Sequence, residues 1–281
     1  MPFIDVGDFR ITLVQAGRYL WDGGAMFGVV PKTLWSKTQP ADQLNRIEAG
    51  LNCFVIDDGS QRVLVETGIG VRHDEIARQR IGMPDPPRIR ETLAAHGFEP
   101  GSIDIVINTH LHWDHVGGNT VDEGGRAVPA LPNARYVVQA GELEHAREQH
   151  PRDAVSYRPV NFEPILEAGR FDPMTGDGTV APCVEVSVAK GHNRDMTIVR
   201  VRSKGETWCH LADLAMYAAQ VTPTWVSAFD LFPLDGIDNK TRIMAEAARE
   251  NWWCSFAHDP KAAFAKVEAK EGKWRTHQVL E

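Results

Sequence analysis

Four residues within six positions carry the side chains most able to do chemistry in this chain. They are His110, His112, Asp114 and His115, in the segment Thr109–Asn119. Side chains two residues apart on an extended chain point to the same side, so His110 and His112 can bind one ion together. A bend after them would turn Asp114 and His115 toward a neighbouring position. Imidazole and carboxylate groups suit zinc, iron or manganese, so the cluster predicts a metal site.

Three later residues stand in the same kind of place, shortly after an apolar stretch that we expect to form a strand. They are His192 after Cys183–Val188, Asp213 after Thr207–Leu211, and His258 after Trp252–Phe256. The first cluster also follows such a strand, Ile103–Asn108. Taken alone, each of these later residues could equally be an ordinary core or loop residue and not a metal ligand. Together with the first cluster they offer enough ligands for two metal ions.

The elements that must position these residues predict an α/β chain. Strands are expected at Ile11–Ala16, Cys53–Ile56, Arg62–Val65 and Thr197–Arg202, and helices at Arg88–His96, Gly141–Gln149, Asp238–Glu250 and Lys261–Lys270. Strands that come first in hairpins and later alternate with helices indicate two packed mixed sheets with helices outside. We expect one domain over residues 1–281.

Two stretches read as long loops. Tyr19–Pro40 carries three glycines, two tryptophans and two prolines, and the region from Gly117 to Pro132 is rich in glycine and proline. Loops of this length are often functional. We expect the segment 19–40 to lie near the active site, where it could also pack against a second subunit in a homodimer. Gly117 and Gly118 should let the backbone pass close to a neighbouring segment.

Composition and charge exclude several classes of function. The chain has 281 residues, 43% of them hydrophobic, and a formal net charge of −8, which disfavours nucleic acid as a partner. We expect no membrane association, because no apolar run approaches the roughly 20 residues of a membrane span. The N-terminus does not resemble a signal peptide, which favours a cytoplasmic protein. The four cysteines form no CxxC pair, and we expect four buried thiols.

The seven candidate residues resemble the signature of the metallo-β-lactamase superfamily. Its HxHxDH motif is present as residues 110–115, and a later histidine, acid and histidine match His192, Asp213 and His258. The strand Val63–Gly68 looks like the family's aspartate-threonine-glycine motif, with Glu66 in place of the aspartate. The resemblance runs from about Leu51 to Asp259. It implies an αβ/βα four-layer sandwich with the metals at one edge.

The resemblance also implies a role for each ligand. His110, His112 and His192 would hold one ion. Asp114, His115 and His258 would hold the other, and Asp213 would bridge the two. The ions would be divalent, with zinc as the first hypothesis and iron, manganese or cobalt as alternatives. Two such ions can share a water and present it as hydroxide at neutral pH. We expect this bridging hydroxide to attack a carbonyl or phosphoryl centre, with Asp114 assisting proton transfer.

The substrate is not determined by the metal site. A lactonase-like enzyme that opens lactones or cleaves carboxylic esters is our first hypothesis, and its partner would be a small ester-type molecule. Lactonases place a tyrosine three residues after the bridging aspartate, where this chain has Met216, and we predict that Tyr217 takes the catalytic role instead. Trp225, Phe229 and Phe232 could add to an apolar pocket wall.

Three alternatives stay open. The second hypothesis is a phosphodiester or phosphotriester hydrolase, and the third is a mononuclear iron redox enzyme. A β-lactamase proper is disfavoured, because those enzymes lack the bridging carboxylate that Asp213 would provide. A different class is a binding protein that kept the fold and lost turnover. Loss of ligands would be its sign, and all seven are present.

Overall fold

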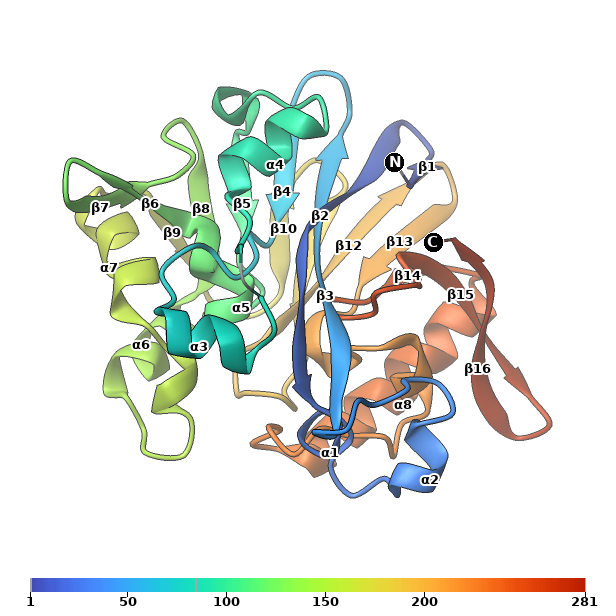
Figure 1. Cartoon of the computed structure of the whole chain (residues 1–281). Helices are drawn as coiled ribbons and strands as arrows, with labels where there is room; N and C mark the ends of the chain where they lie inside the picture. The colour runs from blue at the N-terminus through green and yellow to red at the C-terminus, as the bar shows by residue number, and fades with distance from the viewer. Residues whose placement is uncertain (1, 84, 281) are drawn as a thin grey trace.

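The computed structural model describes residues 2–83 and 85–280 (Figure 1). Among these residues the strands form two seven-stranded sheets and one two-stranded hairpin. In Figure 1 the long β2–β3 pair runs through the middle of the molecule, with α4 toward one end and α1 and α2 at the other. Within the described part of the chain, we find no helix with both the length and the apolar character that a membrane span requires.

The first sheet has the strand order β1-β2-β3-β4-β5-β8-β9. Its strands are β1 (Phe3–Val6), β2 (Phe9–Asp22), β3 (Arg46–Asp57), β4 (Arg62–Val65), β5 (Ile105–Ile107), β8 (Arg135–Gln139) and β9 (Phe171–Met174). The strands β1 to β4 pair antiparallel. The strands β4, β5, β8 and β9 pair parallel, so their carboxyl ends meet at one edge of the sheet.

The second sheet takes the rest of the chain, in the order β10 to β16. Its strands are β10 (Gly178–Ala181), β11 (Val184–Val188), β12 (Thr197–Ser203), β13 (Glu206–His210), β14 (Trp253–Ser255), β15 (Phe264–Lys270) and β16 (Lys273–Leu280). The pair β13–β14 is parallel and is joined by a crossover that contains helix α8 (Pro233–Arg249). The other neighbours in this sheet are antiparallel.

Alternation of side chains along the strands produces the layers. Val63 and Val65 of β4 pack in the core between the two sheets, where Trp208 of β13 also lies. Leu64 packs instead with the helices α1 (Gly23–Phe27), α2 (Lys32–Trp35) and α4 (Ile89–Ala95) on the outer face of the first sheet. Cys209 packs with α8 on the outer face of the second sheet. The αβ/βα four-layer sandwich predicted from the sequence is therefore confirmed.

The remaining helices and turns lie between strands of the first sheet or lead into the site. The helices are α3 (Glu75–Arg80), α5 (Trp113–Val116), α6 (Ala140–Glu148) and α7 (Pro159–Glu167). The 3-10 turns are η1 (Pro100–Ser102), η2 (Gly117–Asn119), η3 (Ala154–Ser156), η4 (Ala212–Leu214) and η5 (Ala218–Val221). The hairpin of β6 (Thr120–Glu123) and β7 (Arg126–Pro129) occupies part of the stretch predicted as a loop after Gly117.

Three further sequence predictions need correction. The segment Lys261–Lys270, predicted as a helix, contains strand β15, because β14 and β16 offer it backbone partners on both sides. In the predicted loop Tyr19–Pro40, the first four residues belong to β2, and α1 and α2 follow. Cys183 is exposed while the other cysteines are buried, because it lies in the tight turn between β10 and β11.

The backbone after the metal-ligand motif passes extremely close to a neighbouring segment, as the two glycines predicted. A Cβ atom built on Gly117 would overlap the carbonyl oxygen of Ile69, and one on Gly118 would overlap that of Thr67. Gly117 has a φ of −59°, so the requirement for glycine there is one of space and not of backbone conformation. The two glycines therefore allow the chain after α5 to pack closely against the loop after β4.

We expect Gly117→Ala to lower the free energy of unfolding by about 3 kcal/mol, because a methyl group must displace the Ile69 backbone. Denaturant unfolding followed by circular dichroism measures this loss. Gly101→Ala is the control, because a Cβ there meets only ordinary contact with Asn133, and a change within about 0.5 kcal/mol is expected. Equal losses in the two variants would contradict the steric argument.

Candidate metal centre

The HxHxDH segment leaves β5 extended and then turns into a helix. His112 has extended backbone angles (φ −64°, ψ 148°) and directly precedes α5. The helix places Asp114 and His115 beside His258, while the ring of His115 also stays close to that of His110, with centroids 4.0 Å apart. This is the bend that the sequence predicted, and it splits one short motif between two neighbouring positions.

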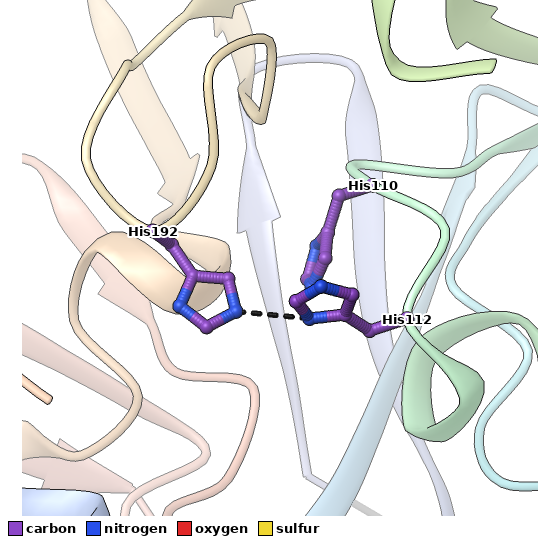
Figure 2. A group of neighbouring side chains, drawn as sticks. All are labelled: His110, His112 and His192. Atoms are coloured by element: carbon purple, nitrogen blue, oxygen red, sulfur yellow. Dashed lines mark hydrogen bonds between the residues drawn. The ribbon is translucent and has the colours of Figure 1, made fainter. Parts of the chain in front are cut away.

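The first position gathers three imidazoles. Ligand atoms of His110, His112 and His192 lie within 4.8 Å of one another, and all three residues are buried. Figure 2 shows His192 approaching from the loop after β11, opposite His110 and His112 on the segment after β5. The His192 Nε2 atom lies 3.0 Å from the His112 Nδ1 atom.

The second position gathers one carboxylate and two imidazoles. Asp114, His115 and His258 also place ligand atoms within 4.8 Å of one another. The Nε2 atoms of His115 and His258 are 3.2 Å apart. His258 follows β14, so this group again joins a segment of the first sheet to a segment of the second.

Asp213 lies between the two groups and turns one carboxylate oxygen toward each. Its Oδ1 atom is 3.2 Å from His115 Nε2 and 3.4 Å from His258 Nε2. Its Oδ2 atom is 3.4 Å from His192 Nε2 and 4.0 Å from His110 Nε2. A carboxylate in this orientation could bind two ions at once.

The chemistry of this donor set fits metal ions. The Nε2 atoms of His110 and His112 are buried and have no hydrogen-bond partner among the described residues. Buried polar atoms without partners are costly, and a cation would satisfy them. Burial and the neighbouring imidazoles lower the pKa of both rings well below the usual value. Both rings are therefore neutral, which is the form that binds a metal.

The charge of the carboxylate at the centre is favoured by its neighbours. Burial opposes ionisation of Asp213, but His115, His258 and His192 together bring its pKa well below the usual value. Burial likewise opposes protonation of His115, whereas Asp213, Asp114 and Glu66 raise its pKa well above the usual value. Without metal the two form a buried ion pair, and a cation would take over the role of the proton on His115.

Partners outside the centre orient three of the imidazoles. The Nδ1 atom of His192 lies 3.0 Å from Asp230 Oδ1, and that of His258 lies 2.9 Å from the carbonyl oxygen of Gly50. The Nδ1 atom of His115 lies 3.5 Å from Glu66 Oε1. Such partners fix which ring nitrogen is free for a metal. Asp230 was missed by the sequence reasoning, since nothing in its surroundings marks it.

Glu66, which stands in place of the family's aspartate, is almost fully buried beside His115. It has a φ of 65°, in the left-handed region that disfavours most side chains. The hydroxyl of Thr109 donates to its Oε1 atom. Glu66 is thus held by the residue that directly precedes His110, and it links the strand end of β4 to the centre.

A cavity opens onto the centre, and aromatic and sulfur side chains form much of its wall. Its lining comprises Tyr19, Trp21, Met26, His112, Trp113, Asp114, Ser156, His192, Asp213, Met216, Phe229 and His258. Tyr19, Trp21 and Met26 come from the segment 19–40, which therefore lies beside the cavity. Tyr19 was not named as a site residue from the sequence, although its hydroxyl donates to Asp114 Oδ2 at 2.8 Å.

The structure does not place Tyr217 at this cavity. Its hydroxyl donates to the carbonyl oxygen of Glu48, and its ring stacks on Phe27 with centroids 5.5 Å apart. The chain is extended at Tyr217, so successive side chains point to opposite sides. Met216 consequently lines the cavity, and Tyr217 packs into the core.

Two of the three aromatic residues predicted for the wall also lie elsewhere. Trp225 packs edge-on against Phe27, with centroids 5.8 Å apart. Phe232 lies under the ammonium group of Lys190. Phe229 is the one of the three that lines the cavity. Sequence spacing could not distinguish them, because the irregular chain after Asp213 has no fixed side-chain period.

Comparisons with known proteins agree with this geometry. The family model described as the metallo-beta-lactamase superfamily matches residues 48–250. The N-acyl homoserine lactonase AiiA of Bacillus thuringiensis subsp. kurstaki is 27% identical over 153 residues, which are 50% of this chain and 54% of that protein. The metallo-hydrolase mfmC of Annulohypoxylon moriforme is 27% identical over 183 residues, covering 56% and 46% of the two chains. The chain thus spans about half the length of these curated relatives.

Solved structures resemble the chain over nearly its whole length. A probable metal-dependent hydrolase from Staphylococcus aureus has a TM-score of 0.89 and 28% identity, and the match covers 99% of this chain and 100% of that one. AidC, a dizinc quorum-quenching lactonase in complex with N-hexanoyl-L-homoserine, has a TM-score of 0.81 and 18% identity, covering 100% and 97%. At 18% identity, the likeness to AidC is one of fold alone.

A buried lysine supports the segment that carries Phe229 and Asp230. Lys240 of α8 is 1% exposed, and its ammonium group donates to the carbonyl oxygen of Trp225 at 2.8 Å. Burial lowers its pKa to about 8, and Asp230 opposes that shift only in part. An unfolded chain would hold the same proton to a pH of about 10.4. Between these pH values the unfolded chain binds more protons, so stability rises with pH.

We therefore expect the free energy of unfolding of the wild type to rise relative to that of Lys240→Met as the pH increases from about 7.5 to about 10, by about 2 kcal/mol. Urea unfolding at several pH values measures the difference. Lys37→Met, at an exposed position, serves as the control and should show no such trend. A constant difference between wild type and Lys240→Met across this range would contradict the predicted linkage.

Proposed function

We propose that this chain, which belongs to the metallo-β-lactamase superfamily, is a dinuclear metal-dependent hydrolase that opens lactones or cleaves carboxylic esters. The observation that carries the proposal is the orientation of Asp213, with one oxygen toward each group of histidines. A mononuclear site would use only one of these oxygens, whereas here the second oxygen faces a second group of potential ligands. The complete second group, with Asp114 and His258, supports a hydrolase over a mononuclear iron enzyme.

In this proposal every predicted ligand has a place. His110, His112 and His192 would hold one ion, Asp114, His115 and His258 the other, and Asp213 both. Bound ions supply Lewis acidity and lower the pKa of water toward neutrality. Nitrogen and oxygen donors suit zinc, which we propose as the native metal. The description of AidC as a dizinc lactonase supports that choice.

Asp114 is the protein group best placed to move protons. Its side chain is 14% exposed, whereas that of Asp213 is 4% exposed, and it lines the cavity. We propose that Asp114 accepts a proton from the attacking water and returns it to the oxygen of the leaving group. Proton transfer by a positioned side chain contributes about 10²–10⁴ in rate.

The cavity wall indicates an apolar substituent on the substrate. Trp21 packs on Trp113 with centroids 5.7 Å apart and on Phe229 with centroids 6.4 Å apart. Together with Met26 and Met216 these rings would bury an acyl chain and exclude water from the reacting centre. The N-acyl homoserine lactonases among the relatives support lactones as substrates. The acidic net charge favours a neutral ester over an anionic phosphodiester.

The architecture also supports a single catalytic domain. One core is shared by the facing sides of both sheets, with Ile11 of β2 and Phe264 of β15 packed in the same cluster. The groups that would hold metal likewise draw residues from both sheets. Neither half of the chain could form the proposed centre alone.

The proposal predicts metal-dependent release of acid from acyl lactones at neutral pH. Zinc-loaded protein should turn over lactones, while chelated protein and His112→Ala should lose at least about 10³ in kcat/KM, because the attacking water is no longer activated. Phosphotriesters and phosphodiesters are assayed alongside. Turnover of phosphoesters with inert lactones would instead establish the second hypothesis. No metal uptake, or no turnover of either class, would favour a binding protein.

Truncation of the cavity wall should change selectivity for the acyl chain. Phe229→Ala should raise KM for long-chain lactones about tenfold, because burial of a phenyl group contributes about 1.5–3 kcal/mol. KM for short-chain lactones should change much less. Phe232→Ala removes a ring of the same segment that does not line the cavity, so it serves as the control. A similar rise in both variants, or for both chain lengths, would contradict the proposed wall.

A further inference from the structure

Asp114 differs from the histidines in the way that it is held. The rings of His115, His192 and His258 have partners in Glu66, in Asp230 and in the main chain of Gly50. Within residues 2–83 and 85–280, the one hydrogen bond to the Asp114 carboxylate comes from the hydroxyl of Tyr19, which donates to Oδ2 at 2.8 Å.

We propose that Tyr19 is the positioning residue for Asp114 in the hydrolysis proposed above, a role that rests on that function. Tyr19 lies near the end of β2, paired with Ala49 of β3, and is 2% exposed. Its ring packs edge-on against His258 and against Trp113, with centroids 6.0 Å away in each case. Strand pairing and ring contacts therefore hold the hydroxyl in one place.

Asp114 needs such a partner because its own element is short. It lies in the first turn of α5, which has four residues, and its side chain is partly exposed to the cavity. Its Oδ2 atom is 3.6 Å from His258 Nε2, and its Oδ1 atom is 4.0 Å from His115 Nε2. Rotation of the carboxylate would exchange or withdraw these oxygens. The Tyr19 hydroxyl fixes Oδ2 and thereby determines which oxygen faces each neighbour.

The tyrosine hydroxyl at this site comes from Tyr19 on β2, a strand far from the HxHxDH motif in the sequence. Position 216, three residues after Asp213, holds a methionine that lines the cavity but cannot donate a hydrogen bond. Tyr217 donates to the main chain away from the cavity. Tyr19 lies in the cavity wall and contacts Asp114 directly. Tyr19 acts through Asp114. Loss of its hydroxyl should therefore weaken metal binding by the group that contains Asp114 and also slow the proton transfer.

Tyr217→Phe is a matched control for Tyr19→Phe. Each change removes one buried phenol hydroxyl with one hydrogen bond and keeps the ring. Both variants should stay folded, with a somewhat larger loss of stability in Tyr19→Phe, because its hydroxyl donates to a carboxylate and that of Tyr217 to a neutral carbonyl. Thermal unfolding of the metal-free proteins checks this. A difference in zinc binding between the two variants then reports the position of the Asp114 carboxylate and not a general loss of folding.

The test is a calorimetric titration of the metal-free full chain with zinc. We expect wild type to bind two equivalents, Tyr19→Phe to bind one of them about 10–100-fold more weakly, and Tyr217→Phe to behave as wild type, since loss of a partner that orients a ligand typically has that cost. In an Asp114→Asn background, Tyr19→Phe should have almost no further effect on zinc affinity, because the two residues act as one unit.

Kinetics on an acyl lactone at saturating zinc provide the second readout. Tyr19→Phe should lower kcat at least about tenfold with KM changed less than about threefold, because proton transfer is affected and the acyl wall is intact. Two results would overturn the role of Tyr19 while leaving the proposed function intact. One is wild-type zinc affinity and kcat in Tyr19→Phe. The other is an equal effect of Tyr19→Phe on zinc affinity with and without Asp114→Asn. A wild-type chain that binds no zinc would overturn the proposed function itself.

Discussion

The Asp213 carboxylate is the group on which the rest of the site depends. Its two oxygens face imidazoles that arrive from different sheets, with His115 on the segment after β5 and His192 and His258 on segments of the second sheet. A buried charge costs several kcal/mol unless partners surround it. The buried charge of Asp213 is therefore stable only where histidines from both sheets surround it. The edge at which the two sheets meet is consequently also the place of the proposed metal centre.

The alignment of the two sheets at this edge is secured by contacts close to the ligands. The amide of Thr197 in β12 donates to the carbonyl of Thr109, one residue before His110. The Asn52 side chain of β3 donates to the carbonyls of Phe256 and Asp259 on either side of His258. Because side chains alternate along a strand, a slip of one residue would turn a ligand away from the centre. The shared apolar core and these polar contacts together prevent such a slip.

The sequence predicted the fold class and the seven clustered residues because both depend on local patterns. Apolar strands followed by histidine or aspartate place those side chains near strand termini, and the parallel pair β13–β14 brings Asp213 and His258 together. Predictions that depended on distant partners were less reliable. Lys261–Lys270 was expected as a helix, but unpaired backbone beside β14 recruits it into the sheet. The role assigned to Tyr217 came from its position near Met216, and the side to which its ring points was decided by packing against Phe27.

The sequence by itself determined which residue types stand at the strand ends, where glycine is needed next to α5, and that the charge of the chain is acidic. These features are local, since each depends on a few neighbouring residues and on the side-chain period of a strand. Only the tertiary structure decided that Tyr19 meets Asp114, that Asp230 supports His192, and that Met216 faces the cavity in place of Tyr217. The partners in the first two of these contacts are 95 and 38 residues apart in the chain. Which such pair forms depends on how whole layers pack, and no local pattern contains that information.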